Sequence, residues 1–208
     1  MKAIIFDFDG VILDSVNVKT LAFVELYSTY GEKIQQQVKS YHLLNGGISR
    51  FEKFKYYHKN FLNIDITDSE LKSLADQFSS LVFEKVCNSK YIKGSLSFLK
   101  TVSKTHLTFI CTGTPQTEIE SILKFKSLDA FFNDVYGSPI SKVTIINQII
   151  DKYKLSSDEI IFIGDAMTDY KAAHETNVKF IGVENSETNF PTNTILVDDL
   201  MDINKLNY

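Results

Sequence analysis

Hydrophobic positions along the chain fall into short runs that alternate with stretches of helical periodicity. Apolar runs with the length and composition of buried strands lie at residues 2–6, 107–111, 134–136, 160–163 and 179–183, with a possible further strand at 194–197. Several runs precede helical patterns, and between residues 142 and 153 the apolar residues repeat at the spacing of one helical face. Strands that alternate with helices predict a doubly wound α/β fold, with a mainly parallel sheet covered on both faces.

Residues 16–90 break this alternation, because they show helical periodicity throughout and contain no convincing strand. A capping-box pattern at residues 67–70 opens one apolar stripe, formed by Leu71, Leu74, Phe78, Leu81, Val82 and Val86. Another stripe is outlined by Phe51, Phe54 and Phe61. We therefore predict a helical cap domain at residues 16–90, inserted into an α/β catalytic core made of residues 1–15 and 91–208.

Composition and charge limit the partners more than the fold. The 208 residues are 44% hydrophobic and 23% charged, so the chain can bury an ordinary core. A net charge of -4 gives no general attraction for nucleic acid or for an anionic membrane, and no apolar run approaches the length of a bilayer span. We therefore expect neither nucleic acid nor a membrane as a partner, while the sequence leaves any oligomeric partner open.

The N-terminus and the cysteines predict a cytoplasmic protein. The first apolar run reaches Asp7 too soon for a signal peptide. Cys87 and Cys111 lie far apart in apolar surroundings, which suits buried hydrophobic side chains in a reducing compartment. The four histidines show no close metal-ligand spacing, so we expect surface or capping roles for them.

Aspartates gather after two of the predicted strands, at the edge where an open parallel sheet binds its ligands. Asp7 and Asp9 end the first strand, and residues two apart in an extended chain point the same way. Asp165 and Asp169 follow the strand at 160–163. One aspartate alone would most simply cap a helix or a turn. Several converging carboxylates resist burial unless a cation compensates them, and all-oxygen ligation favours Mg²⁺.

Two further positions suggest phosphate binding. The second predicted strand ends at Thr112 and Gly113, and Thr114 is a candidate helix N-cap. A helix N-terminus offers N–H groups to an anion and the Thr112 hydroxyl can add a donor, although a simple capped helix start explains the same residues. Lys142 opens the next helix, where the helix dipole disfavours a cation, which suggests that this lysine holds a phosphate or an acid.

With these residues, the chain resembles the haloacid dehalogenase-like hydrolase superfamily, specifically its phosphatases and phosphomutases with a helical cap after the first strand. The resemblance spans nearly the whole chain. The family's motifs appear in order as the Asp-Phe-Asp-Gly-Val segment at 7–11, Thr112-Gly113-Thr114, Lys142, and Gly164-Asp165 followed by Asp169. The first and last motifs are highly specific, whereas the middle two gain weight from their order and strand positions.

The resemblance implies a role for each motif residue. Asp7 would be the nucleophile that forms an aspartyl-phosphate, and Asp9 would protonate the leaving oxygen and then activate water. The implied Mg²⁺ ligands are Asp7, the backbone carbonyl of Asp9, and Asp165, with Asp169 as a ligand or near neighbour. The implied phosphate-binding residues are Thr112, Gly113 and Lys142.

Residues 45–54 are the part of the predicted cap expected to choose the substrate. Their glycine pair predicts a turn that faces the crevice. Arg50 is similar in placement to a substrate-contacting arginine of β-phosphoglucomutase, and we expect it to bind substrate. Ser49 and Glu52 also match a capping box, which would instead leave Arg50 on an exposed helix.

The same stretch continues into a local surplus of positive charge. Its members are Arg50, Lys53, Lys55 and Lys59. The surplus would either draw a second anionic group of the substrate, such as a carboxylate or another phosphate, or form a solvated helix face. Lys19, just inside the predicted cap, points either to the crevice or to water.

The leading hypothesis is a Mg²⁺-dependent phosphatase that hydrolyses a small phosphate monoester, a phosphosugar or a phospho-acid, through an aspartyl-phosphate. A sugar phosphomutase is the enzymatic alternative, since the same motifs serve both and the match at Ser49 and Arg50 favours it. A phospho-signalling or binding module is a further alternative, opposed by the chain order of the acids and by the large helical insertion. An aspartate at position 9 argues against dehalogenation, which attacks carbon and has less need of a proton donor.

Overall fold

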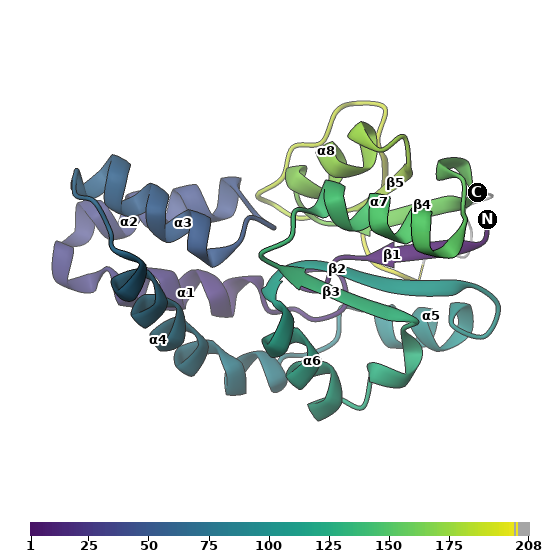
Figure 1. The fold of residues 1–208 in the computed structure, drawn as a ribbon, viewed down its shortest axis with the longest axis horizontal. Helices are drawn as coiled ribbons and strands as arrows, with labels where there is room; N and C mark the ends of the chain where they lie inside the picture. The colour runs from purple at the N-terminus through teal and green to yellow at the C-terminus, as the bar shows by residue number, and fades with distance from the viewer. Residues whose placement is uncertain (202, 204–208) are drawn as a thin grey trace.

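A six-stranded parallel sheet forms the centre of the computed structural model, which describes residues 1–201 and 203 (Figure 1). Its strands are β1 (Ala3–Phe6), β2 (Leu107–Pro115), β3 (Asp134–Ser138), β4 (Ile160–Gly164), β5 (Lys179–Val183) and β6 (Ile195–Val197). The order across the sheet is β3-β2-β1-β4-β5-β6, and every neighbouring pair is parallel. Each predicted strand is present, and the doubly wound α/β fold class is confirmed.

Helices cover both faces of this sheet. They are α5 (Ser95–Val102), α6 (Gln116–Phe125), α7 (Lys142–Tyr153) and α8 (Met167–Glu175), with the short helices η3 (Asp129–Phe131) and η4 (Ser157–Glu159). Alternate residues of β1 face opposite ways: Ile4 and Phe6 pack with α5 and α6, while Ala3 and Ile5 pack with α7 and α8. Figure 1 shows the two helix pairs on opposite sides of the strands. Each fully buried large apolar side chain stabilises the fold by roughly 1.5–3 kcal/mol.

The chain between β1 and α5 forms helices and no sheet strand, and all of it lies in the described part. These helices are α1 (Val16–Leu26), η1 (Ser28–Tyr30), α2 (Glu32–Leu44), α3 (Arg50–Tyr57), η2 (His58–Leu62) and α4 (Asp68–Cys87). In Figure 1 they form a separate layer beyond one end of the sheet. They fall inside the predicted cap of residues 16–90, whose boundaries as a domain stay a prediction.

Aromatic side chains hold the cap helices together. The ring of Phe23 in α1 lies 5.5 Å from that of Phe54 in α3 and 4.3 Å from that of Phe78 in α4. The rings of Tyr27 and Tyr57 meet edge to face at 5.3 Å. Such aromatic pairs add about 0.5–1.5 kcal/mol each beyond their buried area. The cap therefore has an aromatic core of its own, around which its polar residues are arranged.

Two predictions about helix starts had different outcomes. The capping box is confirmed, because the Thr67 hydroxyl accepts from the Glu70 N–H and the Glu70 carboxylate accepts from the Thr67 N–H. The prediction of Thr114 as the N-cap of α6 is wrong. Strand β2 continues to Pro115, which aligns with Ser138 of β3 after a shift in register, so α6 begins only after Pro115.

Cysteines and histidines differ in how well the sequence predicted them. Cys87 and Cys111 are buried and free, as expected. A surface position is wrong for His42 and His58, because helix packing turns both into the cap. The His42 ring lies 4.8 Å from that of Phe23, and the His58 Nδ1 lies 3.0 Å from the Tyr27 hydroxyl.

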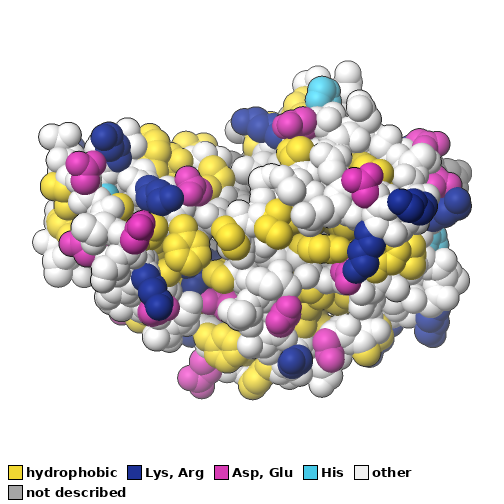
Figure 2. All heavy atoms as spheres, in the orientation of Figure 1, with side chains coloured by type: hydrophobic (Ala, Val, Ile, Leu, Met, Phe, Trp, Pro, Cys, Tyr) yellow, Lys and Arg dark blue, Asp and Glu magenta, His cyan; other side chains and the backbone are white. Residues whose placement is uncertain are grey.

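The outer surface mixes charges of both signs. On the face shown in Figure 2, Lys and Arg side chains are interspersed with Asp and Glu side chains, in keeping with a net charge of -4. No helix in the described ranges, 1–201 and 203, is long and apolar enough to cross a membrane.

Candidate active site

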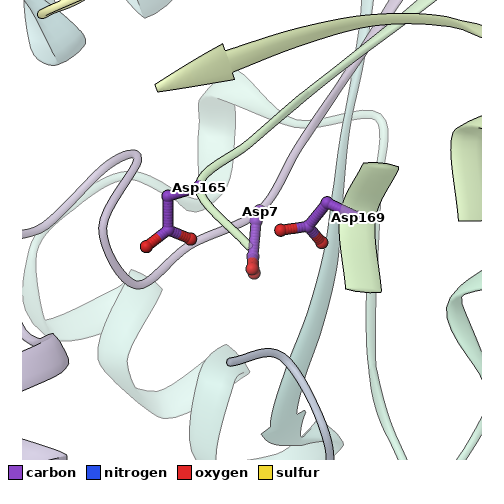
Figure 3. Close-up of side chains that lie close together, drawn as sticks. All are labelled: Asp7, Asp165 and Asp169. Atoms are coloured by element: carbon purple, nitrogen blue, oxygen red, sulfur yellow. The ribbon is translucent and has the colours of Figure 1, made fainter. Parts of the chain in front are cut away.

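Three buried carboxylates converge beyond the ends of two neighbouring strands. Asp7 follows β1, Asp165 follows β4, and Asp169 lies in the first turn of α8. Strands β1 and β4 pair where the strand order reverses, which is where open parallel sheets bind ligands. One oxygen from each aspartate lies within 4.8 Å of the other two. Figure 3 shows Asp7 between the other two carboxylates.

Lys142 offsets part of this negative charge. Its Nζ donates to Oδ2 of Asp7 at 2.8 Å and to Oδ1 of Asp169, so this lysine at a helix start does hold acids. Burial alone would lower the pKa of Lys142, but Asp169 and Asp7 outweigh burial and raise it, so the ammonium stays charged. Among the described residues the Asp165 carboxylate has no hydrogen bond or ion pair. Burial, with repulsion from Asp7 and Asp169, raises the pKa of Asp165 well above its usual range.

The donor set of this cluster fits Mg²⁺. Three carboxylates against one ammonium leave net negative charge in a buried place, and carboxylate oxygens are preferred ligands of Mg²⁺. The raised pKa of Asp165 reflects the same repulsion, which a divalent cation would relieve. Asp7, Asp165 and Asp169 would hold the ion. The Asp9 carboxylate is bound to other side chains, which leaves the backbone carbonyl of Asp9 as its predicted metal ligand.

Two glycines allow the carboxylates to approach the backbone this closely. A Cβ on Gly10 would lie 2.1 Å from Oδ2 of Asp165, and the φ of Gly10 is +80°. A Cβ on Gly164 would lie 2.4 Å from the Cβ of Asp169. Both distances are shorter than any van der Waals contact, so a side chain at either position would displace a carboxylate.

The Asp9 carboxylate faces a separate set of partners at the entrance to the cap. Ser15 Oγ donates to Oδ1 at 2.5 Å, while Lys19 Nζ and Thr114 Oγ1 both donate to Oδ2, the latter at 3.1 Å. Lys19 Nζ also donates to Thr114 Oγ1 at 2.7 Å. Burial would raise the pKa of Asp9, but the nearby Lys19 ammonium, with the hydroxyl donors, holds it below its usual range. Asp9 is therefore an anion in this arrangement, and Lys19 points to the crevice rather than to water.

The cap lies over the remaining motif residues, and a partly open pocket of about 440 Å³ lies between the cap and the core. Thr112 and Gly113 line this pocket together with Asp7 and Asp9. The backbone oxygen of Gly47 would lie 2.5 Å from a Cβ on Gly113, so the two glycines touch backbone to backbone. The glycine turn of the cap thus faces the crevice, as predicted.

A second contact of the same turn lies across the pocket rim. Gly47 has a φ of +77°, and a Cβ there would meet Thr168 Oγ1 at 2.3 Å and Lys142 Nζ at 3.0 Å. Thr168 Oγ1 donates to the Gly46 carbonyl at 2.5 Å. The turn at residues 46–47 therefore contacts Gly113 at the end of β2 and Lys142 and Thr168 in the first turns of α7 and α8.

Arg50 has a different environment from the exposed helix that its capping box suggested. Its side chain is only 4% exposed and makes a two-pronged ion pair with Glu118 of α6, with N–O distances of 2.9 and 2.5 Å. Ser79 of α4 bonds to both members, and the guanidinium lies 4.5 Å from the centre of the Phe78 ring. Arg50 lines the pocket, but its donors hold the cap to the core, and contact with substrate stays a prediction.

The arrangement of sheet, cap and acid motifs matches a known family. The family model for haloacid dehalogenase-like hydrolase matches residues 4–183, which is most of the chain. The chain belongs to the haloacid dehalogenase-like hydrolase family. The resemblance noted from the motifs is confirmed, and the chain is an enzyme of the phosphatase class.

Curated relatives of this hydrolase are phosphoglycolate phosphatases. Those of Pasteurella multocida and Haemophilus influenzae are 22% and 21% identical to the chain over 192 residues. In both comparisons the match covers 88% of this chain and 85% of the relative. At this identity the substrate of the relatives does not carry over without a test.

Solved structures share the fold of this hydrolase. A predicted phosphoglycolate phosphatase from Haemophilus somnus has a TM-score of 0.76 at 21% identity, covering 99% of this chain and 97% of that one. A proposed β-phosphoglucomutase from Bacteroides vulgatus has a TM-score of 0.79 at 15% identity, covering 99% and 86%. The hydrolase YfnB from Bacillus subtilis, solved with bound magnesium, has a TM-score of 0.73 at 17% identity, covering 98% and 97%.

Sequence reasoning did not single out His42 and Lys53 as pocket residues of this hydrolase. His42 and Lys53 both line the pocket and contact each other, although one was expected at the surface and the other was one of several charges on a helix. Their spacing of 11 residues spans two helices, so no single helical pattern links them. The signal that could have found Lys53 is its neighbour Phe54, since both follow the apolar face of α3.

Proposed function

We propose that the chain is a Mg²⁺-dependent phosphatase that hydrolyses a small phosphate monoester through an aspartyl-phosphate on Asp7. The observation that carries this proposal is the convergence of Asp7, Asp165 and Asp169, of which Asp7 and Asp169 bind Lys142, beside a separately held Asp9. A buried group of acids with a single cation needs a divalent ion to bind an anionic substrate. Bound Mg²⁺ would supply positive charge that offsets the repulsion between the phosphate and the acids.

Asp7 and Lys142 act on the phosphoryl group in the first step. The Asp7 carboxylate attacks phosphorus, the bond from phosphorus to the leaving oxygen breaks, and an aspartyl-phosphate forms. Lys142, which stays charged, offsets negative charge that develops on the phosphoryl oxygens, and Thr112 adds a hydroxyl donor on the pocket wall. The leaving oxygen takes a proton from Asp9.

Asp9 changes its protonation state between the two steps. Lys19 keeps Asp9 ionised in the free enzyme, and an arriving phosphate anion raises the pKa of Asp9 by like-charge repulsion while also attracting Lys19. Asp9 then takes up a proton from solvent, and this is the proton that it gives to the leaving oxygen. After the first step Asp9 is an anion again and takes a proton from water, which attacks the aspartyl-phosphate and releases phosphate.

The decisive experiment measures phosphate release from a panel of phosphorylated metabolites with Mg²⁺ and with a chelator. Phosphoglycolate belongs in the panel because the curated relatives are named for it. Asp7→Asn should abolish Mg²⁺-dependent release, while Asp151→Asn, an exposed aspartate on α7, should leave it unchanged. Undiminished turnover in Asp7→Asn would refute the mechanism.

A sugar phosphomutase stays the alternative proposal. It is supported by the place of Arg50 in the pocket, and it requires Arg50 to release Glu118 for a sugar phosphate. Incubation with a sugar bisphosphate separates the two activities. Transfer to a sugar monophosphate that is faster than phosphate release would favour the phosphomutase.

A further inference from the structure

The positively charged side chains of residues 50–59 have different partners in the folded cap. Arg50 is paired with Glu118, while Lys55 and Lys59 form exposed pairs with nearby acids at 3.4 and 3.8 Å. Lys53 is the exception, because it is 2% exposed and makes no ion pair among the described residues. The predicted surplus of positive charge on this segment therefore reduces to one buried ammonium.

Lys53 lies against an imidazole and an aromatic ring. Its Nζ is 2.8 Å from Nδ1 of His42 and 5.5 Å from the centre of the Phe23 ring. Burial, followed by the charges of Lys53 and Lys19, lowers the pKa of His42 well below its usual range, so His42 is neutral. A neutral imidazole accepts one hydrogen bond from Lys53 through Nδ1, and the ammonium keeps two further N–H donors.

Those remaining donors have no described acceptor, and Lys53 lines the same pocket as Asp7 and Asp9. Burial lowers the pKa of Lys53 to about 7, with a further lowering by Lys19 and an opposing effect of Asp9. Lysine side chains are almost never buried without an acidic partner, yet Lys53 is buried close to the charges of the candidate active site. An anion that enters the pocket would therefore stabilise the charged form of Lys53.

We infer that Lys53, positioned by His42, binds a carboxylate of the substrate while the phosphate lies at Asp7. This inference rests on the proposed phosphatase function and narrows its substrate class to phospho-acids. One ammonium with two available donors matches the single charge and two oxygens of a carboxylate. A second phosphate would bring more charge than Lys53 can offset, since the neighbouring Arg50 is already paired with Glu118.

A matched pair of stable ligands tests the inference without turnover. With the full chain and Mg²⁺, the dissociation constants of 3-phosphonopropionate and propylphosphonate are compared by calorimetry. The two ligands share a phosphonate and chain length and differ in the terminal carboxylate. We expect the carboxylate ligand to bind at least about tenfold more tightly, the effect of one charge-assisted hydrogen-bonded contact.

Lys53→Met should bring this ratio close to one while leaving propylphosphonate binding unchanged, because methionine has a similar length and suits an apolar site. Lys55→Met, on an exposed part of the same helix, is the matched control and should keep the wild-type ratio. Binding of propylphosphonate to each variant reports that the phosphate site is folded.

Several results would overturn the inference. These are a wild-type ratio near one, a ratio unchanged in Lys53→Met, and preferential binding of propane-1,3-bisphosphonate over 3-phosphonopropionate, which would assign a second phosphate instead. Failure of the proposed function is a separate outcome, because it appears as no phosphate release from any monoester of the panel, whatever the ligand ratio.

Discussion

Removing one member of the Arg50–Glu118 pair should destabilise the protein strongly. The pair is buried, with side-chain exposures of 4% and 7%, and it joins α3 of the cap to α6 of the core. Loss of one partner leaves the other as an uncompensated buried charge, which costs about 3–5 kcal/mol. Arg50→Met leaves Glu118 with only the hydroxyl of Ser79, and Glu118→Gln leaves Arg50 facing a neutral amide.

The double variant Arg50→Met/Glu118→Leu separates the destabilisation caused by an unpaired buried charge from the contribution of the ion pair to stability. It removes both charges together, so it should be more stable than either single variant, by about 2 kcal/mol or more. Lys55→Met is the control, since its exposed pair with Glu52 should contribute less than about 1 kcal/mol.

Urea unfolding followed by circular dichroism measures these differences. With a slope of about 2 kcal/mol per molar urea, a loss of 3–4 kcal/mol lowers the unfolding midpoint by about 1.5–2 M. Single variants within about 0.5 kcal/mol of wild type would show that the pair carries no such charge penalty. A double variant that is no more stable than the less stable of the two single variants would likewise refute the reasoning.

Further predictions concern the acids, the buried lysine and the tight turn after β1. Mg²⁺ at a hundredfold excess over its dissociation constant should stabilise the wild type by about 2.7 kcal/mol and so raise its melting temperature. In Asp165→Asn the rise in melting temperature should be much smaller, and equal rises in the two proteins by scanning calorimetry would contradict the metal assignment. Burial lowers the pKa of Lys53 from its ordinary value of 10.5 to about 7 in the folded protein, so between these pH values the unfolded state binds more protons. The wild type therefore gains stability as pH rises from about 7 towards 10.5. Lys53→Met lacks this gain, so its advantage over wild type, on the order of a few kcal/mol below pH 7, should shrink as pH rises. In the folded protein His42 contacts Lys53, and the charges of Lys19, Asp9 and Lys142 act on its pKa. An advantage of Lys53→Met that stays the same at every pH in urea titrations would show that burial does not lower the pKa of Lys53. Gly10→Ala should destabilise by roughly 1–3 kcal/mol through its positive φ and should also weaken the Mg²⁺-induced shift, because the new Cβ would displace Asp165.

Local sequence patterns predicted the sheet and the acid cluster well. Each apolar run is a strand because residues buried on both faces of a parallel sheet must be hydrophobic throughout. The strand order then brings Asp7 and Asp165 together automatically, since both follow paired strands. Lys142 was recognisable because a cation at a helix start opposes the helix dipole and so needs a nearby acid.

Residues whose role depends on contacts between distant helices were beyond local patterns. Arg50 meets Glu118 across 68 residues, so its sequence neighbours could not distinguish an exposed helix from a buried ion pair. Lys53 shares the face of α3 that carries Phe54, but its contacts with His42 and Phe23 depend on how α1 and α2 pack against α3. The start of α6 was misplaced for a similar reason, because pairing with β3 extends β2 past the expected helix N-cap.

The backbone contact between Gly47 and Gly113 bears on how fast the enzyme can exchange its ligands. The glycine turn rests on the core and Arg50 binds Glu118, so these two contacts hold the cap over the pocket that Asp7 lines. We expect both contacts to part when substrate enters and again when phosphate leaves. The turnover rate would then depend on solvent viscosity, because the cap must move through solvent. An added viscogen should slow the enzyme even when the chemical step is unchanged.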